Sequence, residues 1–213
     1  RKLDTNNAPA RRLLIELFDG QGNLAPLRAL LEEEIEACKA SDDVEGGARA
    51  RRRLATLLAD QLDDVDAAIP LWVEVRAAQD TRTSDDVSFA TLERLYTKAG
   101  KFADLRALYE EALKSERDPA LISSLTGRLG DILSLHLGGK EEAVSRHLKV
   151  LELDPQNQGS LDALRQLYLD LGKYDDLVAL LRRMMRTTGE ARRLKDLRFQ
   201  LAEVLGAKLG KRA

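Results

Sequence analysis

The sequence predicts an all-α fold, a right-handed α-solenoid of about five antiparallel helical hairpins followed by a C-terminal capping helix. Two stretches, from Phe89 to Leu105 and from Leu161 to Leu177, match at seven positions with a constant offset of 72 residues. A second pattern, Leu–small–x–x–Leu–x–x–x–Leu, begins at Leu54, Leu129 and Leu201 and alternates with the first. Between short polar breaks, apolar residues recur at helical spacing along the whole chain, which is typical of a helical repeat array.

The first half of the chain divides at breaks rich in glycine, serine and aspartate. Residues 1–8 are polar, and we expect them to be loosely ordered. The first hairpin is expected over residues 9–40, with its turn at Gly20-Gln-Gly22. The second is expected over 43–79, where Ser41 or Asp43 can cap the first helix. Pro70 falls inside the second helix of this hairpin and should bend it or shift its start.

The second half divides in the same way. Ser84 is a candidate N-cap for the third hairpin, expected over 86–116. Asp118-Pro119 opens the fourth, over 119–154, and Gly138-Gly139 turns it. The fifth covers 157–187, and a last helix over 190–209 has no partner helix within the chain. We therefore expect a single repeat domain over 9–209.

The overall charge excludes a strong general attraction to nucleic acid. The chain has 34 Lys and Arg against 36 Asp and Glu, a formal net charge of −2. With one cysteine, Cys38, no intrachain disulfide can form. No apolar run approaches the roughly 20 residues of a membrane-spanning helix. Because the chain begins with Arg1, we expect it to be part of a longer protein, and its compartment stays open.

The repeated units resemble the tetratricopeptide repeat (TPR) over nearly all of residues 9–209. The residues that match the family pattern are Phe89, Leu92, Tyr96, Gly100, Tyr109 and Ala112 in the third hairpin, Leu129, Gly130, Ala143 and Pro155 in the fourth, and Leu54, Ala55, Ala68 and Trp72 in the second. The chain departs from the pattern at Glu93 and Arg165, where the family prefers glycine, and at Leu105 and Leu177, where it prefers alanine. The resemblance implies a stack of hairpins, because no hairpin can bury both of its faces alone. It also implies that the stack mediates protein–protein interactions.

Chemical motifs are scarce. The sequence contains no phosphate-binding loop, and the pairs Gly46-Gly47 and Gly138-Gly139 are better explained as a loop and a helix turn. His136 and His147 fall on different expected helices, so we interpret them as surface or packing residues. Acidic pairs fall at helix starts, where capping explains them. We therefore expect no catalysis, no metal and no cofactor.

A peptide-binding groove is the functional expectation that the resemblance supplies. In that family, peptides lie on the concave side, gripped by polar side chains of the first helix of each hairpin. The matching positions chosen as candidate partner-binding residues are Arg12, Arg49, Arg52, Thr56, Arg94, Lys98, Gln166 and Asp170. Further matching positions are Glu16, Asp131, Asp162 and Glu203. This set predicts a groove that is basic in its N-terminal half and acidic in its C-terminal half.

The basic half should attract an acidic segment or a C-terminal carboxylate. In the alternative interpretation these are ordinary solvated side chains, paired along each helix. A structural spacer that self-associates through its ends is the alternative function. RNA binding is a further hypothesis, disfavoured because aromatic residues are sparse, and an enzyme would need a polar pocket that the sequence does not show.

Overall fold

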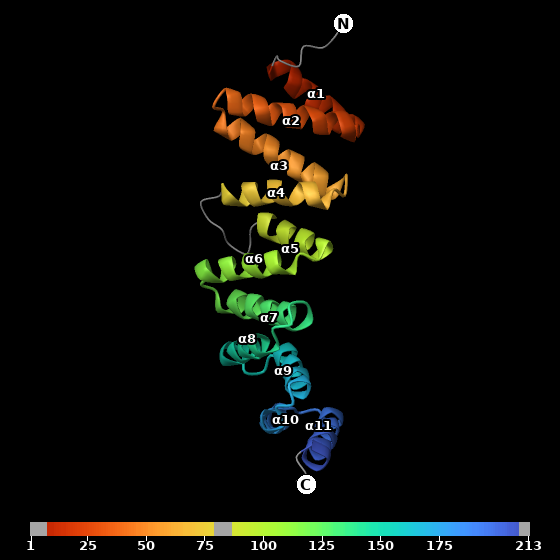
Figure 1. Ribbon diagram of the computed structural model, residues 1–213, viewed down its shortest axis with the longest axis vertical. Coiled ribbons are helices and arrows are strands. Elements are labelled where there is room, and N and C mark those ends of the chain that lie inside the picture. The colour runs from red at the N-terminus through yellow and green to blue at the C-terminus, as the bar shows by residue number, and fades with distance from the viewer. Residues whose placement is uncertain (1–7, 79–86, 209–213) are drawn as a thin grey trace. The chain divides into compact units, whose positions relative to one another are not determined.

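The structure is a computed structural model that describes residues 8–78 and 87–208 (Figure 1). All secondary structure within these ranges is helical. The helices are α1 (Ala8–Gln21), α2 (Leu24–Ala40), α3 (Val44–Asp60), α4 (Val65–Ala77), α5 (Val87–Ala99), α6 (Phe102–Ser115), α7 (Pro119–Leu135), α8 (Lys140–Leu153), α9 (Gln158–Asp170), α10 (Tyr174–Thr187) and α11 (Ala191–Glu203), followed by a short π-helical segment, Val204–Lys208. The predicted all-α class, a series of helical hairpins with a last helix after them, is confirmed. The candidate cap Ser84 lies outside the described residues.

The chain forms two compact units, and each is described by itself. The N-terminal unit is Arg1–Leu108 and the C-terminal unit is Tyr109–Ala213, so that the boundary falls within α6. Within the N-terminal unit, each helix from α1 to α5 packs on the next helix in the sequence. Leu27, Leu31, Leu58, Leu92 and Leu95 are almost completely buried between these helices. In a repeat architecture, each repeat contacts the repeats next to it in the sequence.

The C-terminal unit is built in the same way from α7 to α11. Consecutive helices pack on one another, and α7 also contacts α9, the first helix of the next hairpin. Its core contains Leu129, Leu133, Leu161, Leu164 and Leu181, which are almost completely buried. The last helix, α11, packs on α10 through the buried Leu197.

Side-chain caps fix the starts of several helices. Of the two candidates before α3, Asp43 is the cap, because its carboxylate accepts the Gly46 N–H at 2.9 Å. The Ser41 hydroxyl donates instead to the carbonyl oxygen of Ala37 at the end of α2. Asp118 caps α7, whose first residue is Pro119. Pro70 lies inside α4, not at its start.

The expectation of a loop at Gly46-Gly47 is wrong. Both glycines lie in the first turn of α3 and are buried. A Cβ at Gly46 would meet the carboxylate of the capping Asp43 first, and it would lie 2.9 Å from Sγ of Cys38 in α2. Glycine at this position therefore leaves space for the cap and for the close packing of α3 on α2, and it does not form a loop.

Candidate functional site

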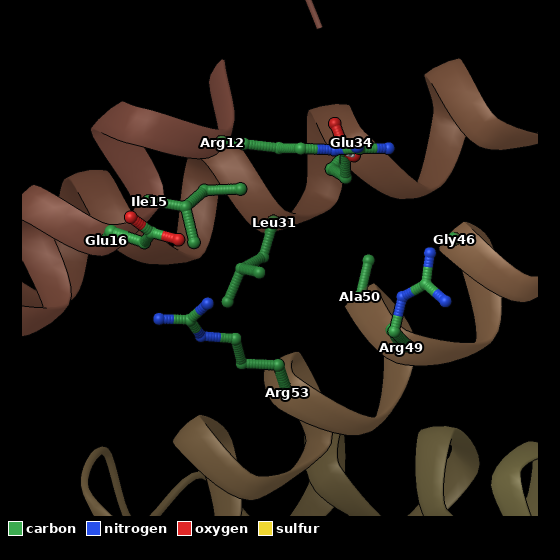
Figure 2. Close-up of a pocket in the computed structure, with 9 residues that line it drawn as sticks. All are labelled: Arg12, Ile15, Glu16, Leu31, Glu34, Gly46, Arg49, Ala50 and Arg53. Atoms are coloured by element: carbon green, nitrogen blue, oxygen red, sulfur yellow. Dashed lines mark ion pairs between the residues drawn. The ribbon is translucent and has the colours of Figure 1, made fainter. Parts of the chain in front are cut away.

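A hollow of about 260 Å³ lies among α1, α2 and α3 of the N-terminal unit (Figure 2). We call it the α1–α3 hollow. It is lined by Arg12, Ile15 and Glu16 of α1, Leu31 and Glu34 of α2, and Gly46, Arg49, Ala50 and Arg53 of α3. Two of the candidate residues, Arg12 and Arg49, are therefore brought together in it, as is the further matching position Glu16.

The hollow combines an apolar lining with basic side chains. Ile15, Leu31 and Ala50 are buried and come from three different helices. Arg12, Arg49 and Arg53 lie around them (Figure 2). An apolar surface beside guanidinium groups can accommodate a segment that carries both an apolar side chain and a carboxylate.

A buried ion pair engages one of the two carboxylates that line this hollow. Arg11 of α1 donates to the carboxylate of Glu34 in α2, and both side chains are buried. The Glu34 carboxylate is thus already engaged by a partner outside the lining. Arg12 approaches the same carboxylate only at 3.6 Å and the Asp43 carboxylate at 3.9 Å.

The two candidate arginines of the hollow are held loosely. The side chain of Arg12 is 59% exposed, and that of Arg49 is 68% exposed. Arg49 lies 3.5 Å from the carboxylate of Glu45, one turn earlier in α3. Charge-assisted hydrogen bonds are usually about 2.7–2.9 Å long. Both guanidinium groups can therefore turn toward a carboxylate that enters the hollow.

Arg53 is a lining residue that was not among the candidates. Its guanidinium group pairs with the Asp19 carboxylate of α1 at 2.5 Å. The helical spacing could have found it, because Arg53 follows Arg49 by four residues and so lies on the same side of α3. Arg52 and Thr56, which were chosen instead, do not line the hollow. Arg52 is exposed, and the Thr56 hydroxyl donates to its carbonyl oxygen at 3.0 Å.

Arg94 and Lys98 are engaged with the preceding hairpin. Arg94 of α5 pairs with Asp60 at the end of α3 at 2.5 Å, and Lys98 pairs with Asp63 in the turn that follows. The Arg53–Asp19 pair has the same separation of 34 residues as the Arg94–Asp60 pair. Basic side chains of one hairpin thus pair with acidic side chains of the hairpin before it. The alternative of paired, solvated side chains therefore describes this part of the surface, although the pairs join different helices.

Gln166 and Asp170 lie together on α9 in the C-terminal unit. The Gln166 amide donates to the Asp170 carboxylate at 2.8 Å, and Lys140 pairs with the same carboxylate at 2.8 Å. The hydrogen bond from Lys140, followed by that from Gln166, lowers the pKa of Asp170 below its ordinary value. This carboxylate is therefore stabilised in its charged form by neighbours within its own unit.

Other acidic positions of the C-terminal unit also have basic neighbours. Asp162 lies 3.9 Å from Arg165 and 3.6 Å from Arg193 of α11. These three residues line a second hollow, of about 410 Å³, beside α9, α10 and α11. Asp131 lies 3.6 Å from the ring of His147. The predicted change from a basic to an acidic groove stays a prediction.

The described residues contain neither a metal-ligand cluster nor a helix able to cross a membrane. No cluster of three or more His, Cys, Asp or Glu side chains suited to a metal ion occurs among residues 8–78 and 87–208. In the same ranges, no helix combines the length and apolar character that crossing a membrane requires.

Comparison with known proteins agrees with the repeats found in the sequence. The sequence profile of the tetratricopeptide repeat matches residues 88–122 and 160–195, which contain the two copies offset by 72 residues. A curated protein, anaphase-promoting complex subunit 7 of Arabidopsis thaliana, is 30% identical over 135 residues. That match covers 63% of this chain and only 23% of the plant protein.

Two solved structures share the fold. One is described as "YrrB: a TPR protein with an unusual peptide-binding site"; it is 14% identical, and the match covers 80% of this chain and 82% of that one with a TM-score of 0.50. The other is pilF of Pseudomonas aeruginosa, 16% identical, with 92% of this chain and 84% of that one covered and a TM-score of 0.50. Likeness at these identities concerns the fold alone.

Proposed function

We propose that this chain, which is a TPR-like helical repeat protein, is a non-catalytic protein–protein interaction scaffold. The Arabidopsis relative carries the name of a subunit of a complex, which supports a role in holding proteins together. Repeat arrays present extended surfaces in place of a single deep active site, and such surfaces suit protein or peptide partners.

The α1–α3 hollow is the proposed site for a peptide segment of the partner. The observation that carries this proposal is the placement of Arg12 and Arg49, loosely held and more than half exposed, beside the buried Ile15 and Leu31. The guanidinium groups of Arg12 and Arg49 would donate hydrogen bonds to an incoming carboxylate. Their present partners, the carboxylates of Glu34, Asp43 and Glu45, lie at 3.5–3.9 Å. The preferred segment therefore has an acidic side chain or a C-terminal carboxylate next to an aliphatic side chain.

Binding of labelled synthetic peptides tests this function by fluorescence polarisation. One peptide combines aliphatic residues with a free C-terminal carboxylate, a second is its C-terminal amide, a third adds acidic side chains, and a fourth is basic. We expect the acidic and carboxylate peptides to bind, with an affinity that falls as salt is added. We expect the basic peptide not to bind.

Two variants of α3 form a matched pair. Arg49→Gln removes a cation that lines the hollow, whereas Arg52→Gln removes an exposed cation three residues later that does not line it. Arg49→Gln should weaken binding by about tenfold or more, because a hydrogen bond to a charged group contributes about 1.5–3 kcal/mol. Arg52→Gln should change binding little. Equal effects of the two variants, or equal binding of the acidic and basic peptides, would exclude the α1–α3 hollow as the site.

A further inference from the structure

The helix α1 follows the same sequence pattern as α5 and α9, the first helices of two later hairpins. In each copy a leucine is followed three residues later by a second leucine, then by an aromatic residue, and four residues after that by glycine. The three copies begin at Leu14, Leu92 and Leu164. Their glycines all have left-handed backbone, with φ between +66° and +68°. The three helices therefore share one register, and their side chains can be compared position by position.

The second leucine of this pattern differs sharply in burial between the copies. It is Leu95 in α5 and Leu167 in α9, which are 0% and 4% exposed, but Leu17 in α1 is 50% exposed. Leu13, one turn earlier in α1, is 67% exposed. Apolar residues at this spacing share one side of a helix. We call this side the α1 outer face; it consists of the exposed Leu13 and Leu17 and the partly buried Leu14 and Phe18.

The preceding hairpin explains why the later copies are buried. α1 packs on α2 and α9 packs on α10, the second helices of their own hairpins. In addition, α4 of the preceding hairpin packs on α5, and α8 packs on α9. α1 is the first helix of the described residues and lies at the end of the N-terminal unit (Figure 1). Its outer face is therefore the surface on which the second helix of a hairpin packs.

The helices α4 and α8 show the chemistry of a helix that packs in this way. Both carry buried side chains at the spacing i, i+3 and i+7, which are Ile69, Trp72 and Arg76 in α4 and Val144, His147 and Leu151 in α8. The guanidinium carbon of Arg76 lies 5.5 Å from the centroid of the Phe89 ring in α5. Nδ1 of His147 lies 3.2 Å from the Ser160 hydroxyl of α9. This stripe of a β-branched residue, a ring and a long side chain therefore faces the next first helix.

We propose that the α1 outer face docks an amphipathic helix of a partner protein, which carries a β-branched residue, a ring and a long side chain at i, i+3 and i+7. The partner helix lies on α1 as α4 lies on α5 and α8 lies on α9. A second copy of this chain is not the occupant, because the stripes of α4 and α8 are already buried within each copy. Docking buries the exposed parts of Leu13 and Leu17, and the hydrophobic effect drives it.

A synthetic helix with the sequence of α8, Lys140–Leu153, tests this docking by fluorescence polarisation. Isolated helices of this length are only marginally stable. A hydrocarbon staple between the exposed positions 145 and 149, away from the stripe, therefore holds the probe helical, and circular dichroism checks its helicity. The control probe carries Val144→Asp and His147→Asp in the same stapled helix. We expect the first probe to bind the whole chain and the control probe not to bind.

Two leucine substitutions in the chain form a matched pair. Leu17 lies on the α1 outer face, whereas Leu135, which is 75% exposed, lies on α7 of the C-terminal unit. Because both side chains are at least half exposed, Leu17→Gln and Leu135→Gln should fold. Leu17→Gln should weaken binding of the probe by about tenfold, the order expected for the burial of an exposed leucine. Leu135→Gln should bind the probe like the wild type.

This docking does not depend on the α1–α3 hollow, because none of the four residues of the α1 outer face lines that hollow. Arg49→Gln should leave the affinity for the probe unchanged, and Leu17→Gln should leave the binding of the acidic peptides unchanged. An acidic peptide should not displace the probe. Failure of one proposal can thus be recognised without reference to the other.

Three results would overturn the proposal. The first is a probe that is helical but does not bind, and the second is equal weakening by Leu17→Gln and Leu135→Gln. The third is self-association of the wild type in sedimentation equilibrium that Leu17→Gln abolishes, because a second copy would then cover the α1 outer face.

Discussion

The imidazole ring of His147 lies against Gly130, so closely that a Cβ at Gly130 would be 2.7 Å from Nε2. His147 belongs to α8 and is 2% exposed. Its Nδ1 atom lies 3.2 Å from the Ser160 hydroxyl at the start of α9. One side chain thus connects α7, α8 and α9 in the core of the C-terminal unit. The glycine leaves the space that the ring occupies.

Gly130→Ala should destabilise the protein by about 1–3 kcal/mol, because the added methyl group overlaps a ring that is packed on all sides. Gly127 provides the control in the same helix. A Cβ at Gly127 would meet only Val150, at an ordinary 3.8 Å, so Gly127→Ala should stabilise by up to about 1 kcal/mol through helix propensity. Urea unfolding measures both changes. A Gly130→Ala variant that is more stable than the wild type would contradict the close packing of His147 on α7.

Burial makes the stability of the C-terminal unit depend on the charge of His147. Desolvation holds the pKa of His147 below its ordinary 6.5, and the nearby Asp131 opposes this shift only in part. The unfolded chain therefore binds a proton at a higher pH than the folded chain does. Stability from this group is complete above about pH 6.5 and is lost as the pH falls toward the lower pKa of the folded state.

Unfolding free energies measured over a pH series should show this loss in the wild type and a smaller loss in His147→Gln. An unchanged slope below pH 6.5 in His147→Gln would show that His147 does not cause it.

Removal of one partner of the buried pair Arg11–Glu34 should destabilise the protein strongly, whereas replacement of both partners by apolar residues should change its stability little. Glu34→Gln removes the carboxylate partner of a buried guanidinium group and should cost about 3–5 kcal/mol. The double variant Arg11→Met, Glu34→Leu should be close to the wild type in stability. In contrast, Glu32→Gln breaks an exposed pair with Arg28 and should cost less than about 1 kcal/mol. Chemical denaturation of the three variants tests this order, and a double variant that is as unstable as Glu34→Gln would contradict it.

Turns between helices use left-handed backbone at corresponding positions of the repeats. Gly100 and Gly172, which are 72 residues apart, both have a φ of +66°. Gly172→Ala should therefore lower the free energy of unfolding by about 1–2 kcal/mol. Asp42 has a φ of +57° without being glycine, so Asp42→Gly should stabilise by up to about 1 kcal/mol. The helical Gly20, which has no atoms near a Cβ, is the control, since Gly20→Ala should not destabilise. Thermal unfolding would contradict this view if Gly172→Ala and Gly20→Ala behaved alike.

The period of the sequence was enough to predict the helical hairpins. Leu92 and Leu164 recur at the same place in their copies, and both are almost completely buried in their own units. The prediction of a loop at Gly46-Gly47 failed because these glycines lie in the first turn of α3, where a Cβ at Gly46 would meet both the Asp43 cap and Cys38 of α2. The contact with Cys38 forms only when α3 packs on α2, so the local sequence does not reveal it.

The candidate site could be predicted only in part. Sequence spacing placed Arg49 and Arg52 on one helix, but the rotation of α3 about its axis decides which of them lines the hollow. The buried Leu54 and Leu58 set that rotation, and it brings Arg53 to the α1–α3 hollow in place of Arg52. Ion pairs such as Arg94–Asp60 span 34 residues and form only when hairpins stack, so patterns within a single helix could not indicate them.

Methyl NMR of the isotopically labelled protein tests the central claim most directly, because it locates a bound peptide on the chain. Addition of a peptide with an aliphatic residue and a free C-terminal carboxylate should shift the methyl signals of Ile15 and Leu31, which line the α1–α3 hollow. The signals of Ile35 and Leu71, which line a separate hollow beside α2 and α4, should stay in place. Shifts at Ile35 and Leu71 with none at Ile15 and Leu31 would contradict the account and place the peptide elsewhere.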